Sequence, residues 1–296
     1  MKSSVRLYAI LARKAPLGVV FRRGPSNHVL LVKWNTQNDS FEHGQWLKGR
    51  IYERRCDLSP KGDLLLYFAA NYRPPYRSWT AISRPPYLSA LALWPKGDGW
   101  GGGGSFDSET LIALNHRHQE LALAKGFKIP KWLKISLFGK RPGWGEDDPI
   151  WSNRLIRDGW TLLDEGKVSR EDYDANVWIE LDPPRTFRKL HPILGKQYAI
   201  EKCIVGLKQK NGPWYLIKHF IVQNGIAVEA LEGSDWADWS QKGDLLFASD
   251  GSLFRLPFIG DVLAPLKNAR RLADFTKTKF EALEPPTEAQ RWPSRK

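Results

Sequence analysis

The sequence has few of the residues that mark secreted, membrane or zinc-binding proteins. Its 296 residues include only two cysteines, Cys56 and Cys203, which cannot form a disulfide framework and lack the spacing of a zinc site. The apolar run from Leu7 to Ala12 is shorter than a signal-peptide core and far shorter than a membrane span. We therefore expect Met1 to be the mature start, the location to be cytoplasmic, and no membrane to be bound.

Motifs for nucleotide and ester chemistry are missing as well. Gly101 to Gly104 is not followed by Lys-Ser or Lys-Thr, as a P-loop requires, and neither GxGxxG after a strand nor GxSxG occurs. These absences argue against nucleotide hydrolysis and α/β-hydrolase chemistry, and we expect no cofactor. The four glycines either mark a domain boundary or form a loop that a ligand or strand approaches closely, and we favour a loop inside one domain.

Tryptophan and basic residues are present in excess. Fourteen tryptophans are spread almost evenly from Trp34 to Trp292, a spacing that favours packing between sheets over a row of stacking platforms. The net charge of +13 is concentrated in residues 1 to 140, which hold 22 Lys or Arg against 9 Asp or Glu. Such a split predicts a basic face that attracts an anionic partner.

One phrase occurs twice and carries most of the fold prediction. Asp57 to Leu65 (DLSPKGDLL) shares seven positions with Asp238 to Leu246 (DWSQKGDLL), 181 residues later. In each copy the Ser-to-Gly stretch suits a type I turn with glycine in the left-handed region. The apolar run that follows does not alternate, as in a strand covered on both faces. Similar short strands, separated by turn residues, occur in both halves of the chain, so we expect a mainly β fold.

The repeated phrase resembles the turn and strand of TolB-like and WD-type β-propeller repeats. The resemblance covers these two short segments, and no Gly-His or Trp-Asp blade signature accompanies it. It implies an irregular β-propeller of about six blades, with a few short helices in the middle and at the C-terminus. The alternative is an α+β fold with two β-rich halves. We expect residues 1 to 283 to form a single domain and residues 284 to 296 to be a loose, basic, proline-rich tail.

Three segments are helix candidates. Ser108 to Lys125 is typical of a capped helix, although its first half can equally be a strand, and Leu266 to Leu283 is a second candidate. Asp148 to Gly159 has the clearest pattern, because Asp148 suits the N-cap, a proline follows it, and Gly159 suits the end.

Two clusters are candidate chemical sites. Glu146, Asp147 and Asp148 lie together in a glycine-flanked loop and can bind Ca²⁺ or Mg²⁺ or act as general acid and base. The dipole of the helix that follows also explains three acidic residues there. His116 and His118 share a face, and can bind a metal, only if their segment is a strand.

A segment rich in arginine and aromatic residues, RPPYRSWTAISRPPY, is the candidate partner-binding region. Basic side chains interleaved with rings are typical of grooves for single-stranded nucleic acid, although the segment also suits an ordinary loop. Its candidate binding residues are Arg73, Tyr76, Arg77, Trp79, Arg84 and Tyr87.

The favoured prediction is a non-catalytic intracellular binding or scaffold module of β-propeller type whose basic face meets an anionic partner. We expect that partner to be a protein, with nucleic acid as the alternative. One alternative is a nucleic-acid-binding protein that uses the Arg/aromatic loop. The other is a metal-dependent hydrolase centred on Glu146, Asp147 and Asp148. No sequence feature indicates an oligomeric state.

Overall fold

The structure is a computed structural model that describes residues 5 to 295. The chain divides into two compact units, which we call unit 1 (residues 1–7 and 155–276) and unit 2 (residues 8–154 and 277–296). Both are built mainly from antiparallel strand pairs, so the prediction of a mainly β fold is confirmed. The single domain of residues 1 to 283 stays a prediction.

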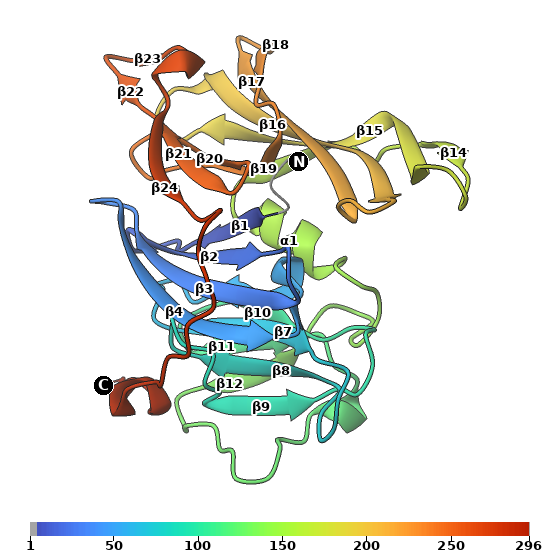
Figure 1. Cartoon of the computed structure of the whole chain (residues 1–296), viewed down its shortest axis with the longest axis vertical. Helices are drawn as coiled ribbons and strands as arrows, with labels where there is room; N and C mark the ends of the chain where they lie inside the picture. The colour runs from blue at the N-terminus through green and yellow to red at the C-terminus, as the bar shows by residue number, and fades with distance from the viewer. Residues whose placement is uncertain (1–4, 296) are drawn as a thin grey trace. The chain divides into compact units, whose positions relative to one another are not determined.

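Two meandering sheets make up much of unit 2 (Figure 1). The first has the order β1-β2-β3-β4. The first two residues of β1 belong to unit 1 and the rest to unit 2. In the second, β7 pairs with β8 and β8 with β9, while the short strands β5 and β6 both pair along the free edge of β7. The bounds are β1 Arg6–Leu11, β2 Leu17–Arg23, β3 His28–Asn35, β4 Ser40–Lys48, β5 Arg50–Ile51, β6 Asp57–Leu58, β7 Leu65–Ala70, β8 Ser78–Ser83 and β9 Ala92–Pro95.

A small third sheet and one helix complete unit 2. β10 (Gly104–Phe106) pairs antiparallel with β11 (Leu111–Leu114), which pairs in parallel with β12 (Lys134–Leu137). Apolar side chains of this sheet and of β7, β8 and β9 share one core, which includes Trp94 and Phe106. Every residue of β7 is buried, as expected for a strand covered on both faces.

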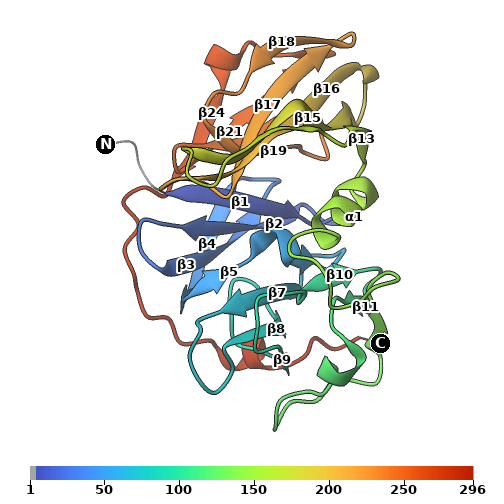
Figure 2. The same cartoon turned by 90° about the vertical axis from the view of Figure 1, so that its right-hand side faces the viewer.

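Unit 1 contains a long sheet with the order β13-β15-β16-β17-β18, with β14 on the other half of β15, and a meander β19-β20-β21-β24. Figure 2 shows β15, β16 and β17 side by side in the long sheet. The bounds are β13 Trp160–Asp164, β14 Val168–Glu171, β15 Val177–His191, β16 Gly195–Gln209, β17 Tyr215–Gln223, β18 Ile226–Ala230, β19 Ser234–Trp239, β20 Leu245–Ser249, β21 Ser252–Leu256, β22 Phe258–Ile259, β23 Val262–Leu263 and β24 Arg270–Asp274.

The repeated phrase forms the same turn in both units. Gly62 donates to the carbonyl of Ser59 at 2.8 Å, and Gly243 donates to Ser240 at 3.0 Å. Both glycines are left-handed, with φ of +79° and +89°. Each turn is the first of a four-strand meander, between β6 and β7 or between β19 and β20. The registers differ by one residue, since Asp57 pairs with Leu66, whereas Asp238 pairs with Leu246.

The helix predictions have mixed outcomes. α1 (Ile150–Arg157) confirms the helix expected after Asp148. Ser108 to Lys125 is not a helix; its first half forms β11, the alternative interpretation, and its second half holds a 3₁₀ turn from His118 to Glu120. Leu266 to Leu283 is not a helix either, because strand pairing of β24 with β21 satisfies its backbone instead. Among the described residues, no helix has both the length and the apolar character needed to cross a bilayer.

The C-terminal segment, expected to be loose, is held by specific contacts up to Arg295. Trp292 donates its indole N–H to the carbonyl of Lys128 at 3.2 Å and packs edge-on against Trp132. Arg295 donates to Glu109 at 2.7 Å and to Asp63 at 3.2 Å. Aromatic and ionic contacts thus fix a segment whose composition suggests mobility.

Candidate functional site

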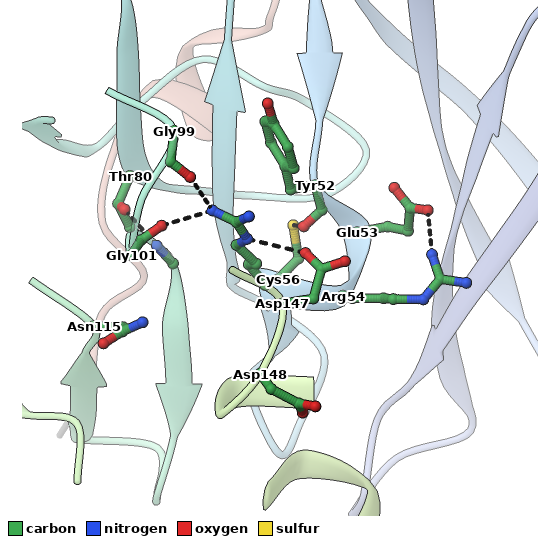
Figure 3. Close-up of polar contacts among 12 residues, drawn as sticks. Tyr52, Glu53, Arg54, Cys56, Thr80, Gly99, Gly101, Asn115, Asp147 and Asp148 are labelled. Atoms are coloured by element: carbon green, nitrogen blue, oxygen red, sulfur yellow. Dashed lines mark hydrogen bonds and ion pairs between the residues drawn. The ribbon is translucent and has the colours of Figure 1, made fainter. Parts of the chain in front are cut away.

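Arg55 is the centre of a buried polar network in unit 2 (Figure 3). The side chain is 2% exposed, and its Nε donates to Asp147 Oδ1 at 2.9 Å. Its Nη1 donates to the carbonyl oxygens of Gly99 and Gly101 at 2.6 and 2.8 Å. One guanidinium therefore ties the glycine loop to the acidic loop and has its own charge satisfied by both.

The glycine loop leaves no room for side chains. Gly102 and Gly103 have φ of +79° and +75°. A Cβ on Gly102 would lie 2.3 Å from Cε2 of Phe68, and one on Gly103 would lie 2.1 Å from the carbonyl oxygen of Arg55. The loop lies inside unit 2, where other backbone segments approach it closely, and does not mark the boundary between the two units.

The three candidate carboxylates have three different environments. Asp147 is paired with Arg55. Asp148 accepts hydrogen bonds from the backbone N–H of Ser152, at 3.2 Å, and from its hydroxyl, as a residue at a helix start does. Glu146 is exposed. Among residues 5 to 295, no three His, Cys, Asp or Glu side chains are grouped so that they could hold a metal ion.

His116 is a buried, neutral histidine, whereas His118 is exposed to solvent. Nε2 of His116 lies 2.7 Å from the hydroxyl of Thr80, and Nδ1 lies 3.1 Å from the carbonyl of Glu120. Because the carbonyl oxygen of Glu120 can only accept, Nδ1 of the neutral ring carries the proton, and Nε2 accepts from the hydroxyl of Thr80. Burial lowers the pKa of His116 to about 4. His118 is exposed at the 3₁₀ turn, so the two rings share no face.

Because the pKa of His116 is lowered in the folded state, we expect folding stability to depend on pH. The unfolded state takes up a proton near pH 6.5 and the folded state only near pH 4, so folding stability falls as pH drops through that window. Between pH 7 and 4.5 the wild type should lose about 2 kcal/mol more than His116→Gln, whose side chain cannot titrate. Urea unfolding at both pH values measures the difference. Equal losses in the two proteins would show that His116 is not the group responsible.

A second set of buried charges lies beside Arg55. Burial alone would raise the pKa of Glu53, but Arg23 and Arg54, at 3.1 and 2.9 Å, outweigh it and hold the pKa at about 2. Cys56 is fully buried and its thiol donates to the carbonyl of Tyr52 at 3.1 Å, and burial raises the pKa of this thiol. These groups are engaged in holding unit 2 together.

Two exposed tryptophans lie on the loops that this network fixes. Trp100 is 57% exposed and Trp144 is 62% exposed. Their loops are joined by a hydrogen bond from the N–H of Gly101 to the carbonyl of Gly145, at 2.7 Å. The side chain of Asn115 donates to the carbonyl of Trp144 at 3.0 Å. The two indoles therefore stand on one fixed platform of backbone and point away from the core.

Basic side chains lie beside Trp144 and along the loop that carries it. The guanidinium of Arg117 lies 6.0 Å from the centre of the Trp144 ring. Lys140 and Arg141 are exposed on the loop that carries Trp144. Within residues 5 to 295, none of these three cations makes an ion pair with an acidic side chain. We call Trp100, Trp144, Arg117, Lys140 and Arg141 the GWG face, because each tryptophan lies between two glycines.

The predicted Arg/aromatic segment does not form one surface. Its residues fall at the two ends of β8, a strand that spans about 17 Å. Arg84 donates to the carbonyl of Glu288, so it holds the C-terminal segment. Trp79 is half-buried within β8. Arg73, Tyr76 and Arg77 lie in the β7–β8 loop, whereas Arg84 and Tyr87 follow the other end of the strand.

The β7–β8 loop lies at the same end of its sheet as the Trp100 loop. Ser78, the first residue of β8, accepts the backbone N–H of Lys96 at 2.9 Å, and its hydroxyl donates to the carbonyl of Asp98. Arg73 and Arg77 are exposed there. Arg73, Tyr76, Arg77 and Trp79 therefore lie at the end of β8 near the Trp100 loop, whereas Arg84 and Tyr87 lie beyond its other end.

Sequence reasoning missed Trp100 and Trp144 because even spacing suggested packing for all fourteen tryptophans. A local signal was present, since both occur as Gly-Trp-Gly, at residues 99–101 and 143–145. Glycine neighbours offer an indole no adjacent side chains to pack against, whereas Trp34 and Trp94 lie in strands and are fully buried.

Nearly all of the net positive charge of the chain lies in unit 2, which also carries the GWG face. Unit 2 holds 27 Lys and Arg against 15 Asp and Glu, a net charge of +12, and unit 1 holds 18 against 17, or +1. The uneven charge predicted from the sequence thus follows the division into two units.

No protein-family model and no curated protein matches this chain. Fold and site define a mainly β protein with a basic, aromatic loop face.

Proposed function

We propose that this chain is a non-catalytic binding module whose GWG face meets an anionic partner. The observation that carries the proposal is the pair of exposed indoles, Trp100 and Trp144, on cross-linked loops beside unpaired cations. Exposing a large apolar ring to water is unfavourable, so exposed rings on a folded protein are typical of contact surfaces. The net charge of +12 on unit 2 favours encounter with a negative partner.

The arrangement of the polar groups supports binding over catalysis. A general acid or base must reach a substrate proton. Asp147 and His116 instead make hydrogen bonds within unit 2, and Cys56 lies fully buried. A metal-dependent hydrolase centred on the loop of Glu146, Asp147 and Asp148 is therefore the weaker proposal.

Single-stranded nucleic acid is the partner that one specific observation favours. Bases stack on exposed indoles regardless of sequence, while phosphates pair with lysine and arginine. Trp100 and Trp144 provide the rings, and Arg117, Lys140 and Arg141 provide the charges. An acidic protein segment would use the same cations but would gain less from the two indoles.

Alanine at both indoles is expected to weaken this interaction. Stacking on an aromatic ring contributes about 1 to 3 kcal/mol per base, so Trp100→Ala with Trp144→Ala should lower the affinity for an oligothymidylate at least about thirtyfold. Fluorescence anisotropy of a labelled strand measures the affinity. For the wild type the affinity should fall steeply as salt rises, because phosphate contacts release counterions.

Three parallel titrations distinguish the possible partners. A single strand, a duplex and a polyglutamate peptide are titrated in parallel at equal ionic strength. Tyr173→Ala, which removes an exposed ring from unit 1, is the matched control and should leave all three affinities unchanged. Preference for the peptide would favour an acidic protein partner. No salt-dependent binding in any arm, or equal affinity of the double variant and the wild type, would contradict the proposal.

We also propose that the meanders are blades of an irregular β-propeller with about six blades. The support is the repeated phrase, which forms the first turn of a four-strand antiparallel meander in both units. Cys56 and Cys203 are free and buried, which supports a cytoplasmic location. An experimental structure of the full chain tests the blade number, and sheets that do not surround a common axis would contradict it.

A further inference from the structure

Three aromatic residues lie close to a lysine at one end of the long sheet in unit 1, and two of their rings contact its ammonium. The register of β15 with β16 and of β16 with β17 places Trp178 and Trp214 on either side of Lys208. The backbone N–H of Lys208 donates to the carbonyl of Trp214 at 2.6 Å. Tyr173, from the loop between β14 and β15, completes the group, which we call the Lys208 cage.

The rings are arranged as a binding site for a cation. Tyr173 and Trp178 meet edge to face, with centroids 5.6 Å apart, and Trp178 and Trp214 do so at 6.4 Å. The ammonium of Lys208 lies 3.9 Å from the centre of the Tyr173 ring and 5.0 Å from that of Trp178. Faces of aromatic rings attract positive charge, so the cage already holds one cation.

The resident cation is accessible and poorly suited to the cage. Tyr173 is 69% exposed, so a ligand can reach the rings from solvent. A lysine ammonium is strongly hydrated and loses water when it enters a cage of rings. A methylated ammonium has fewer N–H groups to desolvate and fits such rings better.

The charges around the cage match a cationic ligand. Four acidic residues lie on the strands and loop beside it. Arg170 pairs with two of them, Asp172 at 3.2 Å and Glu180 at 3.5 Å. In the part of the chain that the structure describes, the carboxylates of Glu171 and Asp174 have no cationic partner. The end of the sheet therefore combines rings that hold a cation with two carboxylates that, among the described residues, are not engaged in ion pairs.

We propose that Tyr173, Trp178 and Trp214 form a site for a methylated ammonium group, which Lys208 occupies until a ligand displaces it. The ligand presents either a trimethyllysine side chain of a partner protein or a free quaternary amine, and both have the same recognised chemistry. This site is separate from the GWG face and does not depend on its role.

Removing the resident cation is the decisive experiment. An exposed cation–π contact corresponds to about two- to fivefold in an equilibrium constant, so Lys208→Met should bind a labelled trimethyllysine peptide about two- to fivefold more tightly than the wild type. Tetramethylammonium and the unmethylated peptide are titrated alongside at equal ionic strength. Peptide binding tighter than that of tetramethylammonium indicates a protein ligand, and the reverse indicates a small amine.

Two ring variants test whether the cage is responsible. Trp178→Ala removes a central ring, and Tyr173→Ala removes an exposed loop ring that the fold does not require. Each, placed in the Lys208→Met protein, should abolish the gain, whereas Trp144→Ala from the GWG face should not change it. Thermal unfolding confirms that each variant folds. If Lys208→Met binds neither amine more tightly than Lys208→Met with Tyr173→Ala, the proposal is wrong.

Discussion

Replacing Arg55 by methionine is expected to lower the free energy of unfolding by about 3 to 5 kcal/mol. Methionine keeps the length and the contact with the Tyr52 and Phe68 rings, which lie 4.7 and 5.2 Å from the guanidinium. It leaves Asp147 as a largely buried carboxylate without its partner, and it leaves the carbonyls of the glycine loop without a donor. Chemical denaturation at neutral pH measures the loss.

Two further variants show where this loss comes from. Adding Asp147→Asn to Arg55→Met removes the stranded charge, so the double variant should recover part of the stability. Arg77→Met, at an exposed position in the β7–β8 loop, should change the stability by less than about 0.5 kcal/mol. A cost for Arg55→Met as small as that of Arg77→Met would show that the network contributes little to folding.

Gly103→Ala is expected to cost about 3 kcal/mol or more. A Cβ there would lie 2.1 Å from the carbonyl oxygen of Arg55, a backbone atom that cannot move away cheaply. The residue also has φ of +75°, which costs alanine about 1 to 2 kcal/mol without any clash.

Gly97→Ala separates these two effects. Gly97 has a similar φ of +87°, but a Cβ there would meet no atom within 4 Å. This variant should show the conformational cost alone, about 1 to 2 kcal/mol. If the two alanine variants unfold at the same denaturant concentration, the close approach at Gly103 has relaxed and the loop is not tightly packed.

Local patterns predicted local structure well. The turns at Ser59 and Ser240, the unalternating strand after each, and the helix after Asp148 were all predictable, because a few neighbouring residues determine their backbone angles. The failures are segments whose backbone is satisfied by distant partners. Leu266 to Leu283 has apolar residues at helical spacing, yet Arg270 to Asp274 pairs with β21 instead.

The candidate site was less predictable than the fold. The Arg/aromatic segment is continuous in sequence, but β8 separates its two ends in space. The GWG face is instead built from segments distant in sequence. Trp100 and Trp144 are 44 positions apart, and a backbone hydrogen bond joins their loops. The role of Asp147 likewise depends on Arg55, 92 positions earlier. The Gly-Trp-Gly pattern could indicate exposed indoles, but no local pattern in a single sequence indicates which distant segments contact each other.

The hydrogen bond between Gly101 and Gly145 has a consequence for how a partner would be bound. The loops under Trp100 and Trp144 are fixed before any ligand arrives, by this bond, by Asn115 and by Arg55. Little backbone entropy is then lost on association, and the ordering cost falls on the side chains of the two indoles and the three cations. Such a preorganised surface selects for partners that already have the matching shape, and its encounter rate is set by diffusion and charge rather than by loop closure.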